Sequence, residues 1–415
     1  MSNLIAVHRP GRAYAIAALL CAALAPACDK NPGGSGSAAT GGDTAAPKGG
    51  GDTIKIGVYS PFSGGSSPMG LSMRDGVRLA AEEINAAGGV LGKKIQLVER
   101  DDQATNERGA QVVQELISSE HVVAILGPTN TGVALASYRY PEQAKVPMLV
   151  NVSAGAPINS LFKEFPENYL FRIAASDDVQ AEMIVKEAIE KEGLKKVAIL
   201  ADDTNYGQNG REKIEQALDK RSMKAVYVGK FKIKDTDMTP QLQEARSAGA
   251  EALLVYGIGP ELAQIANGMQ KLGWKVPMIG GWTLSMSNFI DAAGANGDGA
   301  LMPQTFIQNA AANEKAKKFV ASLTGKLGNP RIPVAVAAAQ GYDSLYLIIR
   351  AIDQAKSTEG PKIKAALESL DKPYDGVIAT WDKPFSASDH EAIKSTQVVM
   401  GVVKGGQVHA PDATK

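Results

Sequence analysis

Three hydrogen-bonding side chains, Thr129, Asn130 and Thr131, follow an apolar run in the stretch VAILGPTNTG (123–132). The apolar run is typical of a buried strand, and the polar cluster begins where a parallel strand would lead into a helix. In doubly wound sheets, ligands gather at this end of the strands. The cluster therefore predicts a site for a phosphate, for a reacting substrate or for a ligand that is only carried.

Five further segments share this position after a predicted strand, and several of them are rich in Gly, Ser and Thr. They are SPFSGGSSPMG (60–70), NVSAGAP (151–157), DDTNYG (202–207), GIGP (257–260) and GGWTLS (280–285). Backbone N–H and hydroxyl groups in such loops suit a polar or anionic group at a helix N-terminus. Helix capping explains any single loop equally well. Six loops of this kind together predict a binding cleft.

Candidate catalytic motifs fail the spacing that enzyme chemistry needs. Gly257-Ile258-Gly259-Pro260 lacks the third glycine of a dinucleotide loop, and Lys94 of GGVLGKK (88–94) stands where a phosphate loop needs a hydroxyl residue. The histidines after the first 28 residues are isolated, and paired acids at strand ends more often cap helices than catalyse. These residues are His121, His390, His409, Asp101-Asp102, Asp177-Asp178 and Asp202-Asp203. We expect a binding protein without metal or cofactor. An exported enzyme would require a His or acid pair assembled in space around a substrate.

Length and charge narrow the class of protein. A chain of 415 residues is longer than one hydrophobic core usually serves, so two domains or lobes are expected. Lys plus Arg and Asp plus Glu both number 44, which gives a formal net charge of zero. Without a basic surplus, nucleic acid is not an expected partner.

Residues 1–28 have the pattern of a secretory signal: Arg9 and Arg12, then the apolar run AYAIAALLCAALA, then APAC. The apolar run is too short to span a bilayer. Ala25-Pro26-Ala27 would fit ordinary signal cleavage, but APAC also resembles a lipobox, in which Cys28 is acylated, although Ala25 replaces the usual leucine. Since the other cysteine, Cys21, lies inside the signal, no disulfide is available to the mature chain.

Residues 29–51, DKNPGGSGSAATGGDTAAPKGGG, have the composition of a flexible linker. As a random coil, this length would span about 25–30 Å, enough to hold a folded body away from a membrane to which Cys28 is anchored. A tail without a role is the alternative. We favour a lipoprotein.

From residue 54, short apolar runs alternate with amphipathic stretches of 10–18 residues in two sets, near 54–172 and 173–301. Strands that alternate with helices predict parallel sheets with helices on both faces. The expected fold class is therefore α/β, with two doubly wound parallel-sheet lobes and a ligand cleft between them. Residues 302–415 hold too few elements for a third domain and should return to these lobes.

Several long stretches resemble one family, the type I periplasmic solute-binding proteins of the leucine/isoleucine/valine-binding group. The stretches are IKIGVYSPFSG (54–64), DGVRLAAEEINAAGGVLGKKIQLVERDDQ (75–103), ILGPTNTG (125–132), LFRIAASDD (170–178), VPMIGGWTLSMSNFIDAAG (276–294) and GYDSLYL (341–347). The resemblance covers nearly all of residues 52–415. It implies a hinge of three crossing strands near Ile173, Met302 and Gly376. Lobe 1 would then comprise 52–172 and 302–375, and lobe 2 would comprise 173–301 and 376–415.

The resemblance also implies roles for single residues. The hydroxyl residue before Gly132 that would hold a ligand carboxylate is Thr131, within the cluster with Thr129 and Asn130. The turn after the fourth strand implies ligand contacts from Ser153, Ala154 and Gly155. Tyr206 would close over the ligand from lobe 2, and Met69 occupies the position in the first loop that is often aromatic.

One position departs from the family pattern. Where amino-acid binders carry an Asp or Glu that pairs with the ligand ammonium, this chain has Trp282. A buried ammonium without a carboxylate is costly. Trp282 could offer a cation–π face, stack on an apolar or aromatic ligand, or be a structural aromatic at the cleft rim. Asp202 or Asp203 could supply an acid instead.

The resemblance implies the substrate-binding component of an ABC importer, which captures a small amino acid, amide or carboxylate in the periplasm and delivers it to an inner-membrane permease. Hinge bending would trap the ligand between the lobes. A sensor that presents the same closed complex to a membrane receptor is the alternative.

Acylation of Cys28 predicts membrane association of the full-length chain in a Gram-negative host. We expect Cys28→Ser to move the protein from the membrane fraction to the soluble fraction, and Cys21→Ser to leave it in the membrane fraction. Fractionation and the intact mass of the mature protein measure this. A wild-type mass equal to that of the unmodified chain from residue 28 would disprove the anchor.

Overall fold

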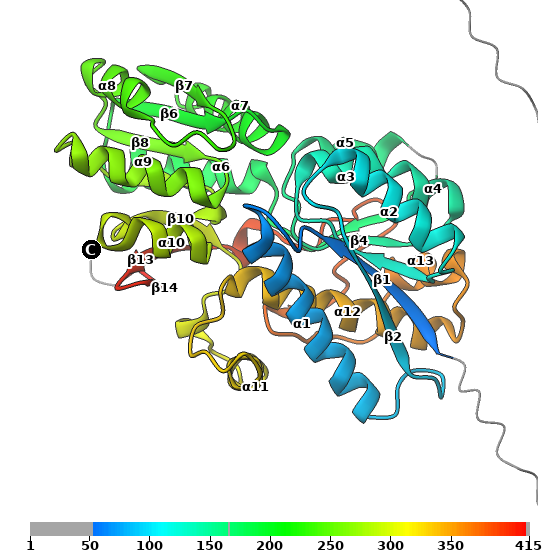
Figure 1. Ribbon diagram of the computed structural model, residues 1–415. Helices are drawn as coiled ribbons and strands as arrows, with labels where there is room; N and C mark the ends of the chain where they lie inside the picture. Colours follow the sequence, from blue (N-terminus) through cyan, green and yellow to red (C-terminus); the bar gives the residue numbers. More distant parts are fainter. Residues whose placement is uncertain (1–52, 165–166, 412–415) are drawn as a thin grey trace, which may run out of the picture. The chain divides into compact units, whose positions relative to one another are not determined.

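The computed structural model describes residues 53–164 and 167–411. The predictions for the signal peptide, the linker and Cys28 lie outside these ranges. The described elements form two large sheets and one small one (Figure 1).

The first large sheet is parallel throughout, with the strand order β2-β1-β3-β4-β5. Its strands are β1 (Ile54–Ser60), β2 (Ile95–Asp101), β3 (Ala124–Leu126), β4 (Met148–Val150) and β5 (Leu170–Arg172). The connecting helices are α1 (Ser67–Ala86), α2 (Asn106–Ser118), α3 (Thr131–Ser137), α4 (Arg139–Ala144) and α5 (Pro157–Glu164). We call this sheet and its helices lobe 1. Between β3 and β4 the helical segment is divided at Tyr138 into α3 and α4.

The second large sheet has the order β14-β13-β10-β9-β8-β6-β7 and is parallel except for β13 and β14, which pair antiparallel at one edge. Its strands are β6 (Val197–Asp202), β7 (Tyr227–Phe231), β8 (Ala252–Tyr256), β9 (Met278–Gly280), β10 (Leu301–Gln304), β13 (Val399–Lys404) and β14 (Gln407–His409). Its helices are α6 (Asp177–Lys186), α7 (Asn205–Asp219), α8 (Thr239–Ser247), α9 (Gly259–Lys271) and α10 (Ser287–Ala293). We call this sheet and its helices lobe 2. The α/β class with two mostly parallel sheets is confirmed.

The late helices return to lobe 1. They are α11 (Glu314–Leu327), α12 (Ala335–Ala355) and α13 (Gly360–Leu367), followed by the small hairpin of β11 (Tyr374–Asp375) and β12 (Thr380–Trp381). After the hairpin, His390 and Ala392 form backbone hydrogen bonds with Arg172 at the end of β5. These bonds favour a third crossover after Ala392, later in the chain than Gly376. The lobe boundaries stay a prediction.

Burial follows the sequence pattern that predicted the strands. Every residue of β6 and β8 is buried, as expected for apolar strands covered by helices on both faces. On α1, the buried Met69, Met73, Val77, Ala80 and Ile84 recur at intervals of three or four residues, which places them on one helical face. In the described part of the chain, no helix combines the length and the apolar character that crossing a bilayer requires.

Two glycines let α1 and α12 pack closely side by side (Figure 1). A Cβ at Gly76 would lie 1.9 Å from the carbonyl oxygen of Ala338, and one at Gly341 would lie 2.1 Å from that of Met73. Because each contact is with backbone, no side-chain rotation could relieve it. The sequence in this region therefore fixes the distance between the two helices.

Gly341→Ala should force these helices apart and lower the free energy of unfolding by about 1–3 kcal/mol, the usual range for overpacking. Gly325→Ala, on the exposed side of α11 with nothing within 4 Å of an added Cβ, is the matched control. The control should leave stability unchanged or raise it by up to about 1 kcal/mol. Urea denaturation measures both, and equal stability of the two variants would contradict the packing argument.

Candidate functional site

Loops at the carboxyl ends of both sheets enclose a cavity that both lobes line. The lining residues are Ser66, Met69, Thr129, Asn130, Val152 and Ala154 from lobe 1, and Tyr206, Ile258, Trp282, Thr283 and Met286 from lobe 2. The free space is about 20 Å³, whereas one water molecule needs about 10–15 Å³ by the same measure. Side chains therefore nearly fill the cavity in this conformation. A larger ligand requires side-chain movement or separation of the lobes.

Six of the nine residues predicted from the sequence line this cavity: Met69, Thr129, Asn130, Ala154, Tyr206 and Trp282. Sequence reasoning did not single out Ser66, Val152, Ile258, Thr283 and Met286. The first four of these lie inside the loop segments that the sequence identified as cleft lining, so the position after a strand was the available signal. Met286 lies one residue beyond GGWTLS and carried no signal.

The other three predicted residues, Thr131, Ser153 and Gly155, form a buried cluster beside the cavity. The Ser153 hydroxyl donates to Thr131 Oγ1 at 3.4 Å, and a Cβ at Gly155 would lie 2.2 Å from Thr131 Cγ2. Thr131 lines a neighbouring opening of about 420 Å³ that shares Asn130 and Tyr206 with the cavity. A ligand role for the nine residues stays a prediction.

Two polar groups of the lining are available to a ligand. Asn130 Nδ2 donates to Ser66 Oγ at 3.1 Å, but its Oδ1 has no hydrogen-bond partner among the described residues. The buried hydroxyl of Tyr206 likewise makes no hydrogen bond of regular geometry within the described chain, although the hydroxyls of Thr283 and Tyr256 lie close to it. Burial raises the pKa of Tyr206 well above its ordinary value, so the hydroxyl keeps its proton and can donate.

The three hydroxyl residues Ser66, Thr129 and Thr283 of the lining already form hydrogen bonds, Ser66 as the acceptor from Asn130. Thr129 Oγ1 lies 2.5 Å from Ser60 Oγ, and the Thr283 hydroxyl donates to the carbonyl of Gly257 at 2.6 Å. These bonds join the end of β1 to the loop after β3, and the loop after β8 to the turn after β9. Asn130, Tyr206 and the hydroxyl proton of Ser66, which accepts from Asn130, keep capacity for a ligand.

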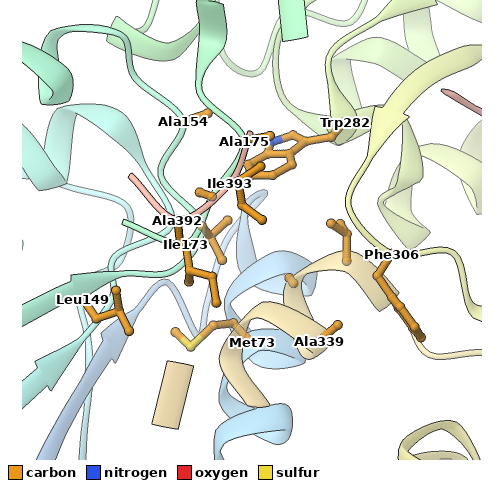
Figure 2. Close-up of a cluster of buried hydrophobic side chains, with 14 of the residues drawn as sticks. Met73, Leu149, Ala154, Ile173, Ala175, Trp282, Phe306, Ala339, Ala392 and Ile393 are labelled. Carbon is orange, nitrogen blue, oxygen red and sulfur yellow. The ribbon is translucent and has the colours of Figure 1, made fainter. Parts of the chain in front are cut away.

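Trp282 begins a short 3₁₀ turn after β9 and is 2% exposed. Its backbone N–H donates to Gln180 Oε1 at 3.0 Å, and its carbonyl accepts from the Ser285 hydroxyl at 2.6 Å. Figure 2 shows its indole in one cluster of buried apolar side chains with Ala175 and Ile393, which belong to the crossover segments. Trp282 is thus fixed at both backbone ends, and its ring contributes to the core and to the cavity wall.

Asp177 joins the two lobes next to the cavity. Its Oδ1 accepts from the Tyr256 hydroxyl at 2.7 Å, and its Oδ2 accepts from the backbone N–H of Ala156 in lobe 1 at 3.3 Å. Burial raises the pKa of Asp177 to about 6, while the Tyr256 hydrogen bond and the charge of Arg172 act in the lowering direction. Tyr256 in turn packs on Tyr206, with ring centroids 4.6 Å apart.

The two acids proposed as substitutes for a family acid lie outside the lining. Asp202 Oδ1 accepts from the backbone N–H of Thr204 at 2.9 Å and from its hydroxyl at 2.5 Å, at the start of α7. Asp203 lines the neighbouring opening. Over residues 53–164 and 167–411, no group of three His, Cys, Asp or Glu side chains is placed to hold a metal ion.

The fold agrees with the comparisons to known proteins. A family model described as periplasmic binding protein matches residues 53–407. The chain belongs to the periplasmic binding protein family. The match spans the first sheet, the second sheet up to the start of β14, and every cavity-lining residue.

Several known proteins are similar to this chain over most of their length. The Leu/Ile/Val-binding protein homolog 3 of Brucella melitensis is 26% identical over 327 residues, 79% of this chain and 86% of that protein. A type 1 periplasmic binding protein from Bordetella pertussis superposes with a TM-score of 0.78 at 26% identity, covering 87% of this chain and all of that one. The branched-chain amino acid transporter substrate-binding protein LivJ of Streptococcus pneumoniae, solved with isoleucine, gives 0.76 at 26% identity over 86% and 98%. These relatives are named as binding proteins, which agrees with the non-enzymatic reading.

The raised pKa of Asp177 predicts a pH dependence of stability. Between about pH 4 and 6 the folded chain holds a proton at Asp177 that the unfolded chain releases, so stability falls as pH rises through this window. A shift of about two units corresponds to a loss of up to about 3 kcal/mol. Asp177→Asn should remove this step from the pH profile of the free energy of unfolding. Other raised acids, among them Asp202, leave a residual slope.

The control is Asp178→Asn, which removes the neighbouring exposed carboxylate on the same helical turn; its charge is the last-named cause of the raised Asp177 pKa, so most of the step should remain. Urea denaturation at pH 4 to 8 measures all three proteins. An identical pH profile for wild type and Asp177→Asn would show that this carboxyl does not titrate in that window.

Proposed function

We propose that this chain is the extracytoplasmic substrate-binding component of an ABC importer. It would bind a small amino acid, amide or carboxylate between the lobes and deliver the closed complex to a permease, tethered through an acylated Cys28. The supporting observation is that lining residues come from both lobes. Binding a ligand in such a cavity and bringing the lobes together are then one event.

Contacts at the rim of the cavity support closure as the binding step. Asn288 Nδ2 on α10 of lobe 2 donates to the carbonyl of Gly65 in lobe 1 at 2.8 Å. Gly65 also faces Pro260 at the start of α9, since an added Cβ would lie 3.5 Å from the Pro260 ring. Both contacts require the lobes to approach each other, so they stabilise the same conformation that encloses the cavity.

The relatives support a transport role. The Streptococcus protein belongs by name to a branched-chain amino acid transporter, and the Brucella protein is named for leucine, isoleucine and valine. At 26% identity, the ligand of this chain need not be the same. The ligand is therefore best found by a screen that includes amino acids, their amides, and aliphatic and aromatic carboxylates.

The screen uses residues 52–415 and thermal unfolding as the readout. A ligand at 100 times its Kd should stabilise the folded chain by about 2.7 kcal/mol. X-ray scattering should then show a smaller radius of gyration with the ligand than without it. Uptake of the labelled ligand should be lost in a strain that lacks the gene. Binding without any loss of uptake would favour a sensor, and the absence of any ligand would overturn the proposal.

With the ligand in hand, Tyr206→Phe and Trp282→Ala should each weaken binding about tenfold or more, because both side chains line the cavity. Tyr227→Phe, on the edge strand β7, is the control and should bind like wild type. Thr131→Ala tests the carboxylate role expected from the resemblance and should also weaken binding. Unchanged affinity in Thr131→Ala and Trp282→Ala together would refute the site assignment.

A further inference from the structure

Ionisable acids and bases are absent from the cavity wall. The lining residues described above comprise hydroxyl, amide and apolar side chains, with no Asp, Glu, Lys, Arg or His among them. A ligand ammonium enclosed here would lose its hydration without gaining a carboxylate partner. Unpaired buried charges are among the most expensive groups in a protein interior.

The acceptors around the cavity are also engaged. Both oxygens of Asp177 receive hydrogen bonds, from Tyr256 and from Ala156. The backbone carbonyls of Ala154, Gly257 and Trp282 accept from Asp177 N–H, the Thr283 hydroxyl and the Ser285 hydroxyl, respectively. Among the lining side chains, the neutral oxygen of Asn130 is then the acceptor left without a partner in the described chain, and it carries no charge to balance an ammonium.

The hydrogen-bond donors of the wall favour a negative group instead. Tyr206 presents a buried hydroxyl that keeps its proton and makes no hydrogen bond of regular geometry among the described residues. Asn130 can present its nitrogen as well as its oxygen, since its partner Ser66 has a hydroxyl that can accept or donate. Helices α1 and α7 begin beside Ser66 and Tyr206, and neither has an acid in its first turn. Their N-terminal ends add a positive potential that opposes the negative charges of Asp177 and Asp202 near Tyr206.

The rest of the lining predicts the body of the ligand. Met69, Val152, Ala154, Ile258, Trp282 and Met286 are apolar, and they surround the polar groups from both lobes. Methionine side chains adapt readily to new neighbours, so Met69 and Met286 are able to make room for a body larger than the present free space. Such a wall suits an aliphatic or aromatic group.

We infer that the ligand is a monocarboxylate with an apolar body and without an α-ammonium group, and that Trp282 determines this preference. The inference rests on the proposed function, because it concerns the same cavity. The carboxylate accepts from Tyr206, Ser66 or Asn130, and the apolar body packs on Trp282. A glutamate at position 282 would supply the charge partner that an amino acid needs.

Matched ligand pairs test this preference by isothermal titration calorimetry on the folded chain. The pairs are L-leucine with 4-methylpentanoate and L-phenylalanine with 3-phenylpropanoate, each differing only in the ammonium group. Wild type should bind the ammonium-free member of at least one pair about tenfold or more tightly than the amino acid. If the amino acid binds equally well or better in every pair that binds at all, the inference is overturned. The proposed function stays intact in that case.

Two variants of nearly equal side-chain volume separate charge from the loss of the indole. Trp282→Glu should shift the preference toward the amino acid by about tenfold or more relative to Trp282→Gln, which removes the ring without adding a carboxylate. Circular dichroism and thermal unfolding check that both variants fold. An identical preference in the two variants would show that position 282 does not set the charge selectivity.

The wider screen separates the two levels of the proposal. If none of the four probes binds but an uncharged amide or another solute does, the inference is wrong while the binding function stands. If no solute of any class raises the stability of the chain or reduces its radius of gyration, the proposed function itself is wrong, and the inference falls with it.

Discussion

A buried guanidinium joins the segments on which the cavity depends. Arg172, at the end of β5, is fully buried and forms a two-pronged ion pair with Glu391, with Nε 2.8 Å from Oε2. Its NH1 donates to the carbonyl of Gly155 at 2.9 Å. Since a buried charge is tolerated only when it is paired and hydrogen-bonded, these partners are held in fixed positions relative to each other. The loop after β4, the first crossover and the returning chain near residue 391 are thereby tied to one point.

The ion pair of Arg172 and Glu391 marks the boundary between the segments fixed to lobe 1 and the segments that can move with lobe 2. Arg172 and Glu391 keep the loop at Gly155 attached to lobe 1, and the chain leaves for lobe 2 only after these residues. Asp177, five residues later, accepts from Ala156 of lobe 1 and from Tyr256 of lobe 2. A bend between Arg172 and Asp177 would therefore change the relation of Tyr256, and of Tyr206 packed on it, to the loops of lobe 1. Hinge and cavity share residues, which is a physical basis for coupling ligand binding to movement of the lobes.

Much of this organisation was predictable because it depends on local sequence patterns. Apolar runs identified the strands, and the Gly-, Ser- and Thr-rich segments after them contain ten of the eleven lining residues, Met286 being the exception. The carboxyl edge of a parallel sheet gathers its loops whatever their detailed conformation, so position in the chain was sufficient. The pairing of β13 and β14 at the sheet edge and the contact of residues 390–392 with β5 depend on distant parts of the chain and left no local signal. For the same reason, the packing of Gly155 on Thr131, which turns Thr131 toward the neighbouring opening, could not be read from GPTNTG.

The polar atoms of the cavity wall give the ligand a specific part in the energetics. In this conformation, Asn130 Oδ1 and the Tyr206 hydroxyl are enclosed by the lobes without a hydrogen bond from the described chain. Leaving such a group unpaired typically costs about 1–3 kcal/mol. When the lobes separate, water can satisfy both atoms, so the unpaired groups favour an open conformation. A ligand that bonds to them removes this penalty only where the lobes meet. Such a ligand binds the closed conformation more tightly than the open one, and this difference in affinity shifts the population toward the closed conformation. An ammonium group could donate to Asn130 Oδ1, but the wall offers it no carboxylate to balance its charge, so selectivity and closure follow from one set of side chains.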